Sequence, residues 1–133
     1  MTKDNAISSF GIALLLSAVS SLSSLSPTCL AAETRWAGYL ADRSCAENCK
    51  AQGLGTDFLN SHKKECALNA SCSKDGYAVF SKGQWYQFDK KGNELARKLL
   101  NDSTTEEGHF VIVSGSLNKE VIAVSKIREV AQK

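Results

Sequence analysis

The sequence predicts a mainly β fold, a small OB-like barrel of five strands with one short helix between the third and fourth strands. Four segments after Gly76 alternate between apolar and polar residues, which is the period of a β-strand. An amphipathic segment, residues 93–102 with Asn93 as N-cap, separates them into two pairs. Both faces of residues 110–113 are apolar, as expected for a strand in a barrel core. The competing architecture is a helix packed on an open antiparallel sheet.

The four alternating segments form two predicted hairpins. They are residues 77–81, 84–89, 109–117 and 120–130. Two residues join the runs of each pair, Lys82-Gly83 in the first and Asn118-Lys119 in the second, and such short links are typical of tight hairpin turns. Gly115 stands inside a strand pattern, where a bulge or tight bend is expected.

A first strand and a cysteine-rich insert precede these hairpins. Residues 35–42 are rich in aromatic and small residues and end in a polar turn, which predicts a strand. The insert covers residues 43–75, and within it residues 56–68 predict a helix with Thr56 as N-cap. A helix there would place three side chains on one face: Phe58, His62 and Cys66.

Residues 1–32 have the composition of a secretory signal peptide. Residues 10–19 are apolar apart from Ser17, a run too short to cross a bilayer, and small residues allow cleavage after Ala31 or Ala32. The alternatives are an uncleaved membrane anchor and a lipoprotein attached through Cys29. We therefore expect an exported protein, periplasmic or extracellular, in which residues 33–133 form a single domain.

The charge balance excludes some classes of partner. Cleavage removes one basic and one acidic residue, so the formal net charge of the mature part stays at +2. A nucleic-acid surface would show a strong basic excess, so no nucleic acid is expected as a partner. The mature part has no second apolar run, so we expect no membrane span after cleavage.

Four cysteines of the insert predict a disulfide framework. Outside the cytoplasm thiols tend to oxidise, and an even set in a small domain usually forms bridges, each stabilising the fold by about 2–4 kcal/mol. The insert has few apolar anchors, so it needs this support. The four cysteines allow three pairings, among which the sequence does not choose. They are Cys45, Cys49, Cys66 and Cys72.

A soft-metal site for zinc or copper is the alternative for the same segment. His62 and Cys66 stand four residues apart, which is a ligand spacing on a helix. Cys45 and Cys72 would complete the ligand set of Cys45, His62, Cys66 and Cys72. The cysteine spacings differ from the Cys-x2-Cys of common zinc knuckles, so disulfides are the preferred hypothesis.

No catalytic arrangement stands out, and we expect a non-enzymatic protein without a cofactor. The segment "CAENC" lacks the Cys-x-x-Cys spacing of thiol oxidoreductases. His109 follows two adjacent glutamates in a polar turn, where a solvated loop is expected. Asp42 is interpreted as a residue that caps a turn. An unrecognised extracytoplasmic enzyme is kept as an alternative.

Aromatic side chains provide the candidate ligand surface. On an OB-like barrel an exposed aromatic row can stack on flat ligands, and alternation along a strand leaves part of such a set exposed. The expected ligand is an unknown small molecule, a glycan or an envelope protein, bound by an accessory or binding domain. The candidate residues are Trp36, Tyr39, Trp85 and Tyr86.

Several motifs resemble those of a group of small exported bacterial proteins of unassigned function. The matching segments are "WAGYLADRSC", "HKKEC", "CSKDGYAVF" and "VIVSGSLNKEVIAVSKI". The resemblance spans nearly all of the mature region and implies an OB-type barrel, but it brings no activity with it. The shared pattern is Gly-x-x-x-Asp-x-x-Cys, then His-x-x-x-Cys, then a further Cys. Cys49 lies outside this pattern. The gap between Cys66 and Cys72 is also longer than in the group. The residues that match are Asp42, Cys45, His62, Cys66 and Cys72.

Overall fold

The computed structural model describes residues 32–132, so the predicted leader and Cys29 lie outside the described residues apart from Ala32. Strands and helices follow one another in the predicted order. They are β1 (Thr34–Asp42), α1 (Arg43–Gln52), α2 (Thr56–Asn60), α3 (Lys64–Leu68), α4 (Ala70–Ser73), β2 (Tyr77–Ser81), β3 (Gln84–Phe88), α5 (Lys90–Asp102), β4 (Phe110–Asn118) and β5 (Val121–Glu129). No helix in this part of the chain is both long and apolar enough to span a bilayer.

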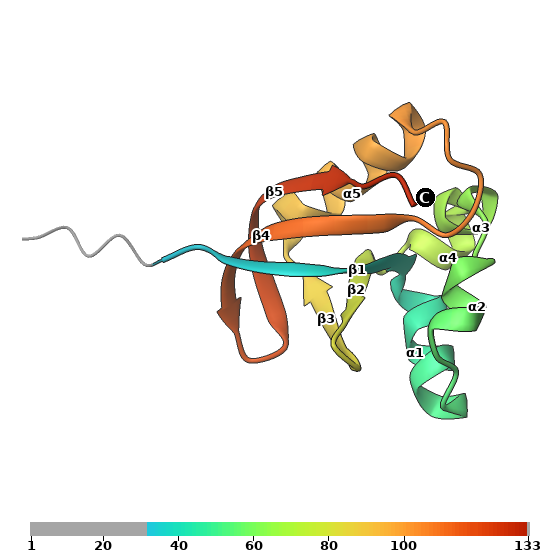
Figure 1. The fold of residues 1–133 in the computed structure, drawn as a ribbon, viewed down its shortest axis with the longest axis horizontal. Helices are drawn as coiled ribbons and strands as arrows, with labels where there is room; N and C mark the ends of the chain where they lie inside the picture. The colour runs from blue at the N-terminus through green and yellow to red at the C-terminus, as the bar shows by residue number, and fades with distance from the viewer. Residues whose placement is uncertain (1–31, 133) are drawn as a thin grey trace, which may run out of the picture.

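The five strands form one mixed sheet that closes into a ring. Their order around the ring is β1-β2-β3-β5-β4, and β4 pairs back onto β1. All neighbours are antiparallel except β3 and β5, which run parallel at Gln87 and Phe88. The prediction of a mainly β fold is confirmed. The alternative of an open antiparallel sheet is wrong, because the sheet is mixed and closed. Figure 1 shows α1, α2, α3 and α4 gathered at one end of the sheet, while α5 packs against β5 and also contacts α3.

Both predicted hairpins are present, and the turn of one is shifted by a residue. Lys82 and Gly83 have φ angles of 51° and 78°, the left-handed conformation that a two-residue hairpin turn requires. In the second hairpin Asn118 pairs with Val121, so the turn is Lys119-Glu120 and not Asn118-Lys119. The register shifts between Ser114 and Gly115, which confirms the predicted bulge.

The helix between β3 and β4 begins earlier than the sequence predicts. Asp89, not Asn93, is its N-cap, and Asp89 Oδ1 accepts hydrogen bonds from Gly92 N at 2.8 Å and Val124 N at 3.2 Å. Asn93 instead accepts a 2.8 Å hydrogen bond from Tyr77 N, at the start of β2. The tertiary bond to Val124 explains the difference, because Asp89 caps the helix and ties it to β5 at once.

The predicted helix over residues 56–68 is broken into α2 and α3. The backbone leaves the helical path around His62 because another segment takes up its hydrogen-bonding groups. Gly108 N donates to His62 O at 3.1 Å, and Lys64 N donates to Glu106 O at 2.8 Å. Phe58, His62 and Cys66 therefore do not share one helical face. His62 lies on the connection between the two short helices.

Two apolar clusters fill the interior. The main core lies inside the ring, where Leu40, Val111 and Ile122 are almost fully buried. The second core lies where the insert covers the outer side of β1, and it contains Tyr39 and Leu59 among its buried members. Because alternate residues of β1 point to opposite faces, this one strand contributes to both cores.

The approach of β1 to β2 gives a stability prediction at Gly38. A Cβ at this position would stand 1.8 Å from the carbonyl oxygen of Phe80, a backbone atom that cannot move aside. We expect Gly38→Ala to lower the free energy of unfolding by about 2–3 kcal/mol, as overpacking does. Urea titration measures the change. Gly55→Ala is the control, because a Cβ there meets nothing within 4 Å, and equal stabilities of the two variants would contradict the close approach.

Candidate functional site

The junction between β1 and α1 positions the first two residues of the candidate site. Asp42 ends β1 and is the N-cap of α1, where its Oδ1 accepts a 2.8 Å hydrogen bond from Cys45 N. An aspartate is favoured at this position because its side chain satisfies a backbone N–H of the first helical turn. The same bond holds Cys45 over the end of the strand, close to the carboxylate.

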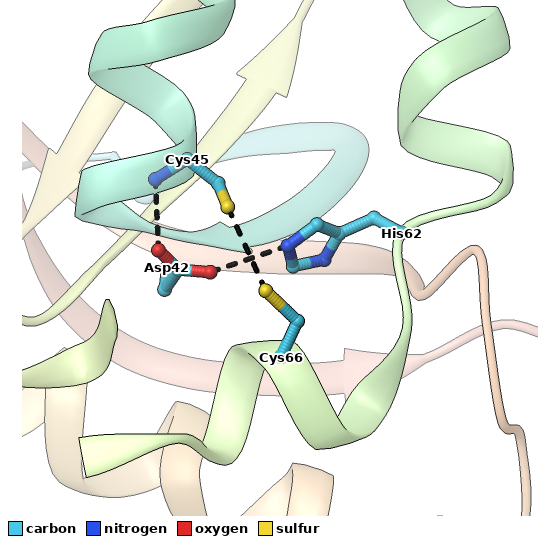
Figure 2. A group of neighbouring side chains, drawn as sticks. All are labelled: Asp42, Cys45, His62 and Cys66. Atoms are coloured by element: carbon cyan, nitrogen blue, oxygen red, sulfur yellow. Dashed lines mark hydrogen bonds and ion pairs between the residues drawn. The ribbon is translucent and has the colours of Figure 1, made fainter. Parts of the chain in front are cut away.

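The connection between α2 and α3, and α3 itself, supply the other two residues. His62 Nε2 lies 3.2 Å from Asp42 Oδ2, and Cys66 Sγ lies 3.9 Å from Cys45 Sγ. Figure 2 shows the four side chains pointing toward one another from three separate segments of backbone. One ligand atom from each residue falls within a group in which all pairs lie within 4.8 Å of one another.

Two members of the group are buried with polar atoms left unsatisfied. Asp42 is 0% exposed and His62 is 5% exposed. Among residues 32–132, Asp42 Oδ2 and both ring nitrogens of His62 have no hydrogen-bond partner, although His62 Nε2 and Asp42 Oδ2 stand 3.2 Å apart as an ion pair. A buried unpaired polar group costs about 1–3 kcal/mol, more when it is charged, so such a pair calls for a further partner.

The electrostatics of the group disfavour a free reactive thiolate. Burial, and then the neighbouring Asp42 carboxylate, raise the pKa of the Cys45 thiol. Burial likewise raises the pKa of Cys66. Burial alone would raise the pKa of Asp42, but its contacts with His62 and with Cys45 N–H hold it below the usual value. The carboxylate thus keeps its charge beside two neutral thiols, which is the opposite of an activated nucleophile.

The distances match the edges of a tetrahedron around a zinc ion. With zinc–sulfur bonds of about 2.3 Å and zinc–nitrogen or zinc–oxygen bonds of about 2.0–2.1 Å, such a tetrahedron has a sulfur–sulfur edge of about 3.8 Å and a nitrogen–oxygen edge of about 3.3 Å. The corresponding distances here are 3.9 Å for Cys45 and Cys66 and 3.2 Å for His62 and Asp42. Two of the six edges therefore agree with a four-coordinate zinc ion, and all the ligand atoms lie within 4.8 Å of one another.

The ligand set differs by one residue from the set expected from the sequence. Cys45, His62 and Cys66 come together as the metal hypothesis requires, but Asp42 stands where Cys72 was expected. Cys72 Sγ contacts Cys66 Sγ at 4.0 Å and lies outside the tight group. Sequence reasoning assigned Asp42 only a capping role, which the structure confirms, and missed its second carboxylate oxygen. The sequence feature that could have identified Asp42 as a ligand is its position three residues before Cys45.

The four cysteines of the insert are free thiols in the structure. Cys49 is buried in the second core with Tyr39, Ala41 and Leu59, and it makes none of the thiol–thiol contacts found among residues 32–132. The disulfide framework stays a prediction, and the arrangement restricts its candidate pairs. Cys66 is the shared partner, because its sulfur lies near those of both Cys45 and Cys72.

The aromatic residues proposed as a ligand surface are divided by the structure. Trp36 and Tyr39 are buried, the first in the main core and the second in the second core. Trp85 and Tyr86 are half-buried in β3, where Trp85 packs against Phe80 with ring centroids 5.1 Å apart. Only Trp85 and Tyr86 thus retain exposed area for the predicted binding surface.

His109 is a buried residue and not the solvated loop residue that the sequence suggests. It is 1% exposed, and its Nδ1 lies 2.7 Å from Glu129 Oε1. The other oxygen of Glu129 accepts a 2.6 Å hydrogen bond from Ser103. The neighbouring Glu106 and Glu107 remain exposed, as expected. The pair of His109 and Glu129 joins the start of β4 to the end of β5 and takes no part in the cluster around Asp42.

No protein-family model matches the chain, and neither a curated protein nor a solved structure was found to match it. The geometry of the site therefore carries the functional argument alone.

Thiol burial predicts the order in which the cysteines react with a small alkylating reagent. We expect Cys72 to be modified first in the native full-length protein, because it is half-exposed and outside the cluster. Cys49 should react only after unfolding, because it is buried in the second core. Timed alkylation followed by peptide mass spectrometry measures both rates, with urea-unfolded protein as the reference. Rapid labelling of Cys49 in the folded protein would show that this part of the insert is wrongly placed.

Proposed function

We propose that the chain is a zinc-binding protein, in which Asp42, Cys45, His62 and Cys66 hold one ion in a closed four-ligand site. The observation that carries the proposal is the set of buried unpartnered polar atoms, Asp42 Oδ2 and the ring nitrogens of His62, beside two thiol sulfurs whose separation equals a tetrahedral edge. An ion at their centre gives a partner to Asp42 Oδ2 and to one ring nitrogen of His62. It also turns the thiols into thiolates, because a bound cation reverses the effect of burial.

The chemistry of the ligands favours zinc over other divalent ions. Two sulfurs and an imidazole exclude magnesium and calcium, which take oxygen ligands, and they suit zinc or copper(I). The Asp42 carboxylate is a hard oxygen ligand that zinc accepts and that copper(I), a soft ion, does not prefer. With four protein ligands the site leaves no position for water, which is the pattern of a structural and not a catalytic zinc.

The proposed role of the ion is to fasten the insert to the sheet. The ligands come from the β1–α1 junction, the α2–α3 connection and α3, so one ion ties three segments together. The insert offers few apolar residues of its own, and Leu54 and Phe58 are exposed. Metal-ligand bonds can supply the folding free energy that such a segment lacks. In this proposal zinc replaces the predicted disulfides as the main support of the insert.

We extend the proposal to the fold type, the cellular location and the role of the domain. The ring order β1-β2-β3-β5-β4, with a helix between β3 and β4, supports an OB-like barrel. The leader supports an exported, non-enzymatic accessory or binding domain. The half-buried Trp85 and Tyr86 stay the proposed surface for its ligand or envelope partner.

Metal analysis of the purified protein tests the proposal. We expect about one zinc per chain by elemental analysis, and all four thiols of the insert to be titratable after denaturation in a chelator. Asp42→Asn keeps a side-chain oxygen for the cap of α1 but loses the anionic ligand, so we expect zinc affinity to fall by about tenfold or more. Competition with a chromogenic chelator measures the affinity.

The control variant is Asp75→Asn, which removes one exposed carboxylate of the same insert far from any ligand role. Its zinc content and affinity should equal those of the unaltered protein. Native protein that holds no zinc and contains two disulfides would overturn the proposal in favour of the disulfide framework.

A further inference from the structure

Cys72 is a thiol that the proposed zinc site does not use. Its sulfur lies 4.0 Å from that of Cys66 but falls outside the cluster that would hold the ion. The side chain is half-exposed, so small solutes reach it. Besides Cys66, the Ser71 hydroxyl contacts its sulfur at 3.9 Å. One thiol thus stands beside a zinc ligand on the solvent side without a ligand role of its own.

The backbone around Cys72 allows the two sulfurs to approach. Cys72 lies in α4, a helix of four residues, and Asn69 is both the C-cap of α3 and the N-cap of α4. The sulfurs must move closer by about 2 Å to form a disulfide bond. Rotation of the half-exposed Cys72 side chain and a small shift of this short helix would supply such a movement.

We propose that Cys66 and Cys72 form an oxidation site for peroxides, and that formation of their disulfide releases the zinc ion. This inference rests on the proposed zinc site, since it describes how that site is regulated. Once Cys66 is bonded to Cys72, its sulfur has no thiolate charge to offer, and the ion keeps only three protein ligands. The disulfide predicted from the sequence and the zinc ion are then alternative states of one segment.

The reaction is balanced with hydrogen peroxide as the oxidant. The Cys66 sulfur attacks one peroxide oxygen, the O–O bond breaks, and hydroxide leaves, so that Cys66 carries a sulfenic acid. The Cys72 sulfur then attacks the Cys66 sulfur, the S–O bond breaks, and water leaves with the thiol proton. Each sulfur loses one electron overall, the peroxide takes up two, and the zinc ion departs with its charge unchanged.

Position favours Cys72 over the other two thiols as the partner of Cys66. Cys45 would bind the same ion as Cys66, and two sulfurs on one tetrahedral zinc are kept about 3.8 Å apart. Cys49 is buried in the second core and makes no contact with either sulfur. Of these three thiols, Cys72 is the one that contacts Cys66 and lies outside the group proposed to hold the ion.

The test follows zinc release and thiol loss in the zinc-loaded full-length protein. On addition of hydrogen peroxide we expect one zinc to appear at a chromogenic chelator for every two thiols lost, and peptide mass spectrometry to show Cys66 joined to Cys72. Cys72→Ser should load zinc as the unaltered protein does, because Cys72 is not a ligand, but release it at least tenfold more slowly. Cys49→Ser is the matched control and should release zinc at the unaltered rate. A thiol reductant should restore zinc binding.

Two results would overturn the inference while leaving the zinc site in place. One is equal release by Cys72→Ser and the unaltered protein, and the other is a disulfide between Cys45 and Cys66. Protein that never binds zinc would overturn the proposed function instead. In that case disulfide mapping of the oxidised protein still decides whether Cys66 and Cys72 are the reacting pair.

Discussion

The two carboxylate oxygens of Asp42 carry the interaction on which the arrangement of the insert depends. One oxygen accepts the backbone N–H of Cys45 and begins α1, and the other faces His62. Asp42 also ends β1, so a single buried side chain connects the sheet, the first helix of the insert and the connection that follows α2. Its carboxylate is stable in a buried position only with partners on both oxygens, because an unpaired buried charge is costly. The cap satisfies one oxygen, and the proposed ion satisfies the other.

The backbone around His62 is held by the segment between α5 and β4. The backbone of residues 106–108 binds that of residues 62–64, and Gly108 adopts a φ of 68° with its Cα packed against Asn60. A side chain at Gly108 would meet the Asn60 carbonyl oxygen at 2.6 Å. The backbone position of one candidate ligand is thus set by residues more than forty positions away in the chain.

The sequence predicted the parts of the molecule that depend on local patterns. The order of elements, the Lys82-Gly83 turn and the bulge at Gly115 follow from period and from glycine placement, and the structure confirms them. The break at His62 was not predictable, because it arises from hydrogen bonds to Glu106 and Gly108. Three of the four candidate ligands were named from their residue type. Asp42 was missed as a ligand because capping already explained it, and its second role needs the approach of His62.

The short separation of the candidate ligands along the chain has a consequence for the order of folding. All four lie within residues 42–66, whereas closure of the ring requires β4 and β5, which come last. Contacts between residues near in sequence form with a smaller loss of loop entropy than distant ones. Because synthesis starts at the amino terminus, the proposed ion can bind these four residues before β4 and β5 form the final hairpin. The ion would then act as a nucleus that presents β1 and β2 to the later strands.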